Sequence, residues 1–178
     1  MILAASSFAF TASDASAQKN PMVGGAEMFR TKDIVDNAVN SKDHTTLVAA
    51  VKAAGLVETL KGAGPFTVFA PTNTAFEKLP AGTVDTLLKP ENKEMLTKIL
   101  TYHVVAGNMD SKAIMKAIKK GKGMATLTTV SGNTLTATME GKNLMLKDEK
   151  GGMSTVTTAN VRQSNGVIHV VDTVVMPN

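Results

Sequence analysis

In the last third of the chain, Thr, Val and Leu recur in short runs separated by turn residues. Five such runs follow residue 124, with Gly- and Asn-containing connections between them. Strand-forming runs joined in this way predict an antiparallel meander. The predicted strands are Met124–Val130, Thr134–Glu140, Asn143–Lys147, Met153–Val161 and Val167–Val175.

Before residue 124, apolar residues recur every three or four positions, which is typical of helices packed through one face. One predicted helix has Asp43 as its cap, Gly55 as its stop, and Leu47 and Val51 on its inner face. Early helices followed by a run of strands favour an α+β fold over a doubly wound sheet.

A second amphipathic helix is predicted after Asp110, which is placed to cap it. Ile114, Ala117 and Ile118 would face inward. The outer face would carry lysines.

The segment Pro65–Glu77 predicts a strand that leads into a helix. Its side chains alternate, with Phe66, Val68 and Ala70 on one face and Thr67 and Phe69 on the other. Pro71 would end the strand because it offers no N–H to a ladder. Asn73 and Thr74 are predicted to cap the following helix, in which Thr74 and Glu77 have capping-box spacing. Tyr102–Val105 also has strand character, which would point Tyr102 and His103 in opposite directions.

The N-terminal residues are typical of an export signal. Residues 1–10 are small and apolar, and Ala15-Ser16-Ala17 matches a signal-peptidase site, so residues 1–17 are predicted to be a truncated signal peptide. A disordered Ala/Ser-rich tail is the alternative. Residues 18–30 would form a flexible lead-in and residues 31–178 one domain, with no later stretch long enough to cross a bilayer.

Composition narrows the function classes. The chain has 178 residues, a formal charge of +4 and no cysteine, which excludes disulfides and thiolate sites. Its arginines are Arg30 and Arg162, so nucleic-acid binding is not expected. A monomer is expected.

Three motifs in order carry a resemblance to a known family. They are T-V-F-A-P-T-N-T-A-F (67–76), Y-H-V-V (102–105) and N-G-V-I-H-V-V-D-T-V-V-M-P (165–177). Together they closely resemble the fasciclin domain, from about Thr31 to the C-terminus. One departure is Ala106, where the family often has proline.

The resemblance implies a β-wedge or sandwich packed against a helical layer. It also implies a secreted or periplasmic protein that works in adhesion by binding, without catalysis or cofactor. Partners would be a cell-surface or matrix protein or an acidic polysaccharide. The matching motif positions, expected to be structural, are Phe69, Pro71, Thr72, Asn73, Phe76, Asn165, Gly166, His169 and Asp172.

The histidines give little support to catalysis or metal binding. His44, His103 and His169 have no H-x-H or H-x-x-x-H spacing, and no metal site is expected. His103 and His169 are expected to be buried and hydrogen-bonded. A triad of Ser131 or Ser164 with His169 and Asp172 would need two groups on opposite strand faces to meet.

Two binding surfaces are candidates. Tyr102 and His103 match a dipeptide linked to integrin adhesion in some animal fasciclin proteins, although core packing is the alternative. Lys112, Lys116 and Lys119 share a helical face whose positive field suits anionic polymers, although a solvated face is the alternative.

The leading hypothesis is therefore a non-catalytic extracytoplasmic binding domain. A second hypothesis is a small-ligand carrier with an apolar pocket between helices and sheet. A third is a hydrolase dependent on His169 or His103.

Overall fold

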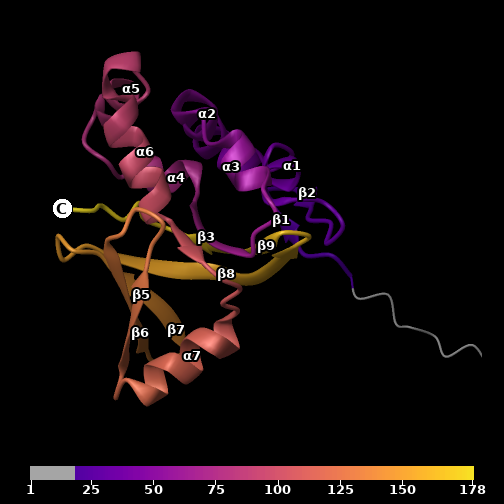
Figure 1. Ribbon diagram of the computed structural model, residues 1–178, viewed down its shortest axis with the longest axis vertical. Coiled ribbons are helices and arrows are strands. Elements are labelled where there is room, and N and C mark those ends of the chain that lie inside the picture. The colour runs from indigo at the N-terminus through magenta and orange to yellow at the C-terminus, as the bar shows by residue number, and fades with distance from the viewer. Residues whose placement is uncertain (1–18) are drawn as a thin grey trace, which may run out of the picture.

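The computed structural model describes residues 19–178, so the predicted signal peptide at residues 1–17 lies outside the described part. Most helices lie on one side of a curved sheet, and α7 lies on the other (Figure 1). The helices are α1 (Ile34–Ala38), η1 (Lys42–His44), α2 (Thr45–Ala54), α3 (Val57–Lys61), α4 (Asn73–Glu77), α5 (Thr83–Leu87), η2 (Pro90–Asn92), α6 (Lys93–Tyr102) and α7 (Ser111–Lys120). The strands are β1 (Met22–Val23), β2 (Ala26–Glu27), β3 (Phe66–Pro71), β4 (Val104–Ala106), β5 (Met124–Thr128), β6 (Thr134–Glu140), β7 (Asn143–Lys147), β8 (Met153–Gln163) and β9 (Gly166–Val171).

The main sheet confirms the predicted α+β fold and its meander. Its seven strands have the order β4-β3-β9-β8-β7-β6-β5, and β5 to β9 are antiparallel neighbours. The early strand β3 is parallel to β9 and antiparallel to β4. The sheet curls so far that its end strands meet. Val105 forms an antiparallel bridge with Thr129, and the Val130 N–H donates to the Val104 carbonyl over 2.8 Å.

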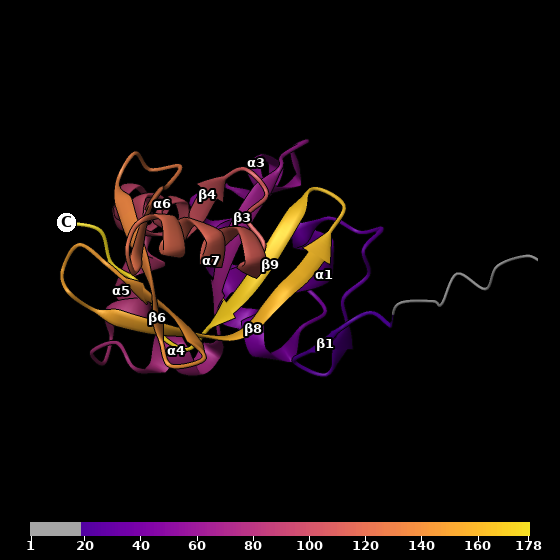
Figure 2. The same cartoon turned by 90° about the horizontal axis from the view of Figure 1, so that it is seen from below.

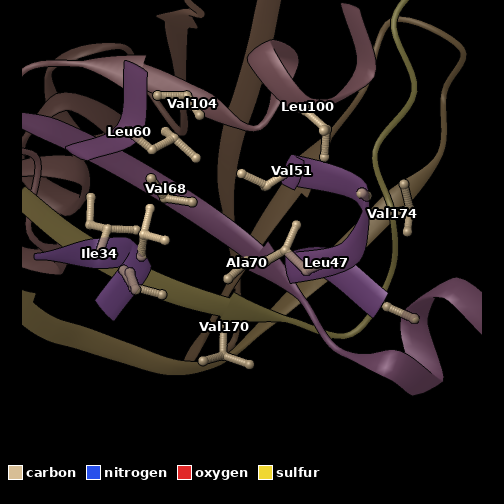
Figure 3. Close-up of a cluster of buried hydrophobic side chains, with 14 of the residues drawn as sticks. Ile34, Leu47, Val51, Leu60, Val68, Ala70, Leu100, Val104, Val170 and Val174 are labelled. Atoms are coloured by element: carbon tan, nitrogen blue, oxygen red, sulfur yellow. The ribbon is translucent and has the colours of Figure 1, made fainter. Parts of the chain in front are cut away.

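The alternation predicted for β3 divides the apolar interior into two cores. Val68 and Ala70 face the helices, whereas Phe69 faces into the curled sheet. The helix-side core lies between α1–α6 and the sheet, and Figure 3 shows its side chains converging from both layers. Its members include Ile34, Leu47, Val51, Leu60, Val68, Ala70, Phe76, Leu100, Val104, Val170 and Val174. The sheet-side core lies beneath α7 and includes Phe69, Tyr102, Val105, Ile114, Ile118, Leu135, Leu146, Val171 and Val175.

The segment predicted as a flexible lead-in contains regular structure. Strands β1 and β2 pair as a hairpin, and Val23 and Met28 are buried in the helix-side core. Gly24 and Gly25 form the turn with φ angles of 57° and 76°, which glycine adopts without steric cost. Glycine here therefore indicates a tight turn instead of flexibility.

The strand prediction for Tyr102 and His103 is wrong. Helix α6 continues through Tyr102, His103 is its C-cap, and β4 begins at Val104. The sequence Tyr102–Val105 fits the strand period and also the helical period, because Leu96, Ile99 and Leu100 form an apolar helical stripe that leads up to it. Burial of that stripe carries the helix to Tyr102.

The predicted helix caps are partly wrong. Asp43 lies inside η1, and α2 begins at Thr45 without a cap from its own N-terminal side chain. Helix α4 is capped by Thr72, whose hydroxyl accepts from the Ala75 N–H over 3.2 Å. Asn73 instead caps α2, accepting from the Thr46 N–H over 3.0 Å.

Candidate binding surface

Helix α7 lies on the side of the sheet opposite the other helices (Figure 1), and it is near the viewer when the molecule is seen from below (Figure 2). Its exposed residues are mainly lysines. Ile114 and Ile118 are buried at 0% and 4% exposure and anchor the helix over β5 and β6. The side chains of Lys112, Lys116 and Lys119 are exposed. We call these three residues the α7 lysine surface. Lys120 and Lys122 extend it toward β5.

The start of α7 is fixed by several hydrogen bonds. Asp110 accepts from the Ala113 N–H over 2.9 Å, as predicted, and its other oxygen accepts from Arg162 on β8 over 2.8 Å. Asn160, also on β8, bonds the Ser111 N–H and hydroxyl at 2.8 and 2.7 Å. The pKa of Asp110 is lowered, chiefly by the Ala113 hydrogen bond and further by Arg162 and Lys112. The lysines therefore project from a helix whose first turn is fixed by hydrogen bonds to β8 and to its own cap.

The charges of this surface are not neutralised within the fold. Ion pairs in residues 19–178 form between Lys61 and two aspartates, between Lys78 and Asp172, and between Arg162 and Asp110. No carboxylate in that part of the chain lies within 4.0 Å of an ammonium of the α7 lysine surface. Its positive field is consequently available to an external anion.

Tyr102 is fully buried and takes part in the sheet-side core. Its hydroxyl donates to the Thr134 carbonyl over 2.7 Å and accepts from the Glu149 N–H over 3.3 Å. Burial raises the pKa of Tyr102 to about 12. The side chain offers no surface to a partner in this conformation, in keeping with the core-packing alternative.

His103 is also internal, with 2% of its surface exposed. Nδ1 lies 2.8 Å from the Ile99 carbonyl, and Nε2 accepts from the Val175 N–H over 3.2 Å. These partners define a neutral ring with its proton on Nδ1. Burial lowers the pKa of His103 to about 4. Its role is to join the end of α6 to the C-terminal segment.

His169 and Asp172, the pair considered for a triad, are hydrogen-bonded to different partners. The His169 ring is buried, stacks on Phe69 with centroids 5.6 Å apart, and places Nε2 2.9 Å from the Met109 carbonyl. Asp172 accepts from the Thr155 N–H over 2.8 Å and faces Lys78 at 3.6 Å. Desolvation lowers the pKa of His169, so its buried ring is neutral. Each group is committed to backbone or to a separate partner.

The Ser131 hydroxyl lies 2.8 Å from the Thr129 hydroxyl. Ser164 donates its N–H to the Lys32 carbonyl over 2.9 Å.

Within residues 19–178 no cluster of three or more His, Asp or Glu side chains could hold a metal ion. In the same range, no helix is long and apolar enough to span a membrane.

Two motif asparagines connect elements that are distant in sequence. Asn165 is buried, accepts from the Ile34 N–H over 3.1 Å, and donates to the Leu60 and Gly62 carbonyls over 2.6 and 3.0 Å. It thereby joins the start of α1 to the end of α3. Asn73 joins α4 to the start of α2, with a donated bond to the Lys42 carbonyl over 2.8 Å.

The remaining motif positions are also architectural. Pro71 is buried at the end of β3, and Phe76 is buried in the helix-side core. A Cβ on Gly166 would lie 2.0 Å from the Phe66 carbonyl oxygen, so only glycine allows the close β3–β9 approach.

His44 is a buried polar residue that the sequence did not single out. It is 3% exposed, and its Nδ1 lies 2.8 Å from the Ser41 hydroxyl. Its Nε2 is the buried side-chain polar atom in the described residues that has no hydrogen-bond partner. Burial lowers the pKa of His44, partly offset by the Ala70 carbonyl and by Asp43. His44 ends η1, and only the tertiary packing of this short helix reveals that the ring is buried.

Comparisons with known proteins agree with this architecture. A model of the fasciclin domain family matches residues 42–177, and the chain therefore belongs to the fasciclin domain family, which is associated with cell adhesion and surface proteins. The chain is 45% identical to Protein sll1483 of Synechocystis over 162 residues, covering 90% of this chain and 82% of the relative. It is 34% identical to the cell surface glycolipoprotein MPB83 of Mycobacterium bovis over 167 residues, covering 90% of this chain and 68% of the relative.

A solved structure shares the fold at low sequence identity. It is a FAS1 domain pair from the insect cell adhesion molecule fasciclin I, with a TM-score of 0.70 and 17% identity. The match covers 80% of this chain and 50% of the insect chain. It confirms the predicted fold.

Proposed function

We propose that the protein is a non-catalytic adhesion domain that works outside the cytoplasm and attaches to an anionic surface or polymer. The exposed, unneutralised α7 lysine surface carries this proposal. An acidic polysaccharide is the favoured partner class, because three ammonium groups on one helical face match a repeating anion without requiring a shaped pocket. A cell-surface or matrix protein with an acidic patch is the alternative.

The state of the other candidate groups supports a binding role. Tyr102, His103 and His169 each use their polar atoms in hydrogen bonds that hold the fold together. General acid–base catalysis needs a group within reach of a substrate proton. A hydrolase dependent on His103 or His169 is accordingly the weaker hypothesis.

A location outside the cytoplasm is part of the same proposal. It is supported by the small-residue pattern at Ala15–Ala17 and by the surface location stated in the name of MPB83. Mass spectrometry of the exported protein should find a mature N-terminus at Gln18. Recovery of the intact chain from the cytoplasm alone would contradict the proposed location.

The test of the binding function is retention of residues 18–178 on immobilised acidic and neutral polysaccharides across a salt series. The triple substitution Lys112→Ser, Lys116→Ser and Lys119→Ser should weaken binding by on the order of 100-fold, since each lysine contributes roughly 1 kcal/mol at an anionic surface. Binding of the unmodified protein should fall steeply between low and physiological salt.

A matched variant separates local charge from net charge. Lys42, Lys89 and Lys93 are exposed, belong to the helical layer, and form no ion pair within the described residues. Replacing these three by Ser removes the same charge from the opposite part of the molecule and should leave most of the binding intact. Equal losses in both triple variants would show that net charge, and not the α7 lysine surface, governs attachment.

A further inference from the structure

Helix α7 ends in a turn that holds a lysine in a backbone conformation typical of glycine. The Lys122 N–H donates to the Lys119 carbonyl over 3.3 Å. The Gly123 N–H donates to the Ile118 carbonyl over 2.9 Å, and the two bonds together form a Schellman motif. The left-handed position of this motif is Lys122, with a φ angle of 57°. Glycine is the usual residue there, because a side chain in the left-handed region costs free energy.

Glycine occupies the positions on both sides of Lys122. A Cβ on Gly121 would collide with the Met124 carbonyl oxygen, so the turn excludes a side chain there. Gly123 has a φ angle of 110°. A third glycine, at position 122, would remove the remaining strain, yet the sequence has lysine. Backbone strain of this kind recurs at functional sites, which points to a use for the Lys122 ammonium.

A second lysine lies at the same end of the meander. Strand β5 begins at Met124, which pairs with Thr138 near the end of β6, and Lys142 lies in the turn from β6 to β7. Figure 1 shows this end of the strands next to the C-terminal end of α7. Lys122 and Lys142 are exposed, and neither forms an ion pair within residues 19–178. We call these two residues the tip lysines.

The tip lysines lengthen the positive surface beyond the helix. From Lys112 to Lys120 the helix rises about 12 Å, because each residue adds about 1.5 Å. Lys142 lies one to two strands beyond β5, a further distance of roughly 5–10 Å. The surface is therefore longer than the screening length of about 8 Å at physiological salt, so its two ends cannot both act on one small anion. A long polymer can contact both ends.

We propose that the attachment surface continues from α7 across the tip lysines, and that its partner is a linear acidic polysaccharide lying along the helix and over this end of the meander. The inference rests on the proposed attachment function and narrows the partner to an extended, unbranched polyanion. A carboxylate also lies at this end. Glu140, the last residue of β6, is exposed, forms no ion pair within the described residues, and would repel such a chain.

The experiment measures binding of residues 18–178 to galacturonate oligomers of increasing length and to polygalacturonate, an unbranched polymer with one carboxylate on each sugar. Affinity should rise with length until one oligomer covers both α7 and the tip lysines. Lys122→Gln and Lys142→Ser should each weaken binding of the polymer roughly fivefold, the value of one lysine at an anionic surface. Each should also shorten the length at which affinity stops rising. Glu140→Gln should strengthen binding by up to about fivefold, because it removes the opposing charge.

Substitutions at position 122 separate charge from backbone strain. Lys122→Gly removes both, so it should raise the melting temperature by about 2–4 °C while it weakens binding. Lys122→Gln removes the charge and keeps the strain, and Lys122→Arg keeps both. As a control for net charge, Lys150→Gln removes one lysine from the exposed turn after the other end of β7 and should leave binding within about twofold of the unmodified protein.

Several results would overturn the proposal. Unchanged binding in Lys122→Gln and Lys142→Ser, together with loss of binding in the triple variant of the α7 lysine surface, would confine attachment to the helix and leave the proposed function standing. Affinity that does not depend on oligomer length would exclude an extended chain as the partner. A lower melting temperature in Lys122→Gly would show that Lys122 stabilises the turn. Absence of binding to every acidic polysaccharide would overturn the proposed function and this inference together.

Discussion

The two cores share one sheet but are built differently. The sheet-side core is filled by Tyr102, Phe69 and His169, each fully buried, and the polar atoms of Tyr102 and His169 are hydrogen-bonded. The helix-side core consists of aliphatic side chains with one buried phenylalanine, Phe76, and encloses a cavity beside the unsatisfied His44. The residues that line this cavity are mainly aliphatic, and the rings of Phe66, Phe69 and His103 also contribute to its wall.

The difference extends to how each layer is attached to the sheet. Helix α7 is held over the sheet-side core by apolar packing of Ile114 and Ile118 and by the network around Asp110. The helical layer is held in addition by Asn73 and Asn165, whose amides join helix ends that are far apart in sequence. The two layers are thus attached to the sheet by different means, α7 through apolar packing and one capping network, and the helical layer also through two bridging amides.

The largest expected effect comes from the same truncation made in each core. Leu135→Ala, in the sheet-side core, should lower the free energy of unfolding by about 4 kcal/mol, and Leu47→Ala, at the cavity, by about 2–3 kcal/mol. Leu135 is fully enclosed, whereas part of Leu47 already faces empty space and loses fewer contacts. Urea denaturation measures both. Equal losses would mean that the two cores are equally well packed.

The second prediction compares the stability lost when Asn165 and Asn73 are each replaced by Ala. Asn165→Ala should cost about 3 kcal/mol, because three backbone groups lose their partner in a buried site. Asn73→Ala should cost about 1 kcal/mol, since Asn73 is only half-buried and water can replace its bonds. Asn40→Ala, at an exposed amide, serves as the control in the same denaturation series. A larger loss at Asn73 than at Asn165 would contradict this ranking.

A smaller effect, spread over a pH range, is expected at His103, which lies between the cores. Its pKa falls from 6.5 to about 4 on folding, so between these values the unfolded chain binds the proton and the native protein does not. Stability is therefore full above pH 6.5 and declines as the pH falls toward 4, by at most about 3 kcal/mol. His44 and His169 shift in the same direction.

Denaturation curves at pH 7 and at pH 4.5 measure this decline. His103→Gln retains a donor and an acceptor but does not titrate, so it should flatten the part of the decline that belongs to His103. An unchanged pH dependence in this variant would assign the decline to other groups.

The sequence predicted those elements whose pattern is local. Strands β6 and β7 agree with prediction at both ends, because their buried residues, Leu135 and Ala137 in β6 and Leu144 and Leu146 in β7, recur at every second position. The cap of α7 by Asp110 was also predictable, since donor and acceptor are three residues apart. The shared face of Lys112, Lys116 and Lys119 was predictable too, because residues three and four positions apart lie on one side of a helix.

What the sequence could not predict depends on partners distant along the chain. Asn73 has the residue type of a helix cap, yet its amide reaches α2, a helix 27 residues earlier. Tyr102 lies in a run that suits both helix and strand, and its hydroxyl partner Thr134 is 32 residues away. The cavity and the orphan nitrogen of His44 arise from the fit of two layers, which no periodicity encodes.

The bridge between Val105 and Thr129 has a consequence for crowding at a surface. A sheet normally ends in two strands whose free N–H and C=O groups can pair with another molecule. Here β4 and β5 meet each other at that bridge, so part of each free edge is already occupied. Copies held side by side on an anionic polymer would have less exposed strand edge through which to aggregate.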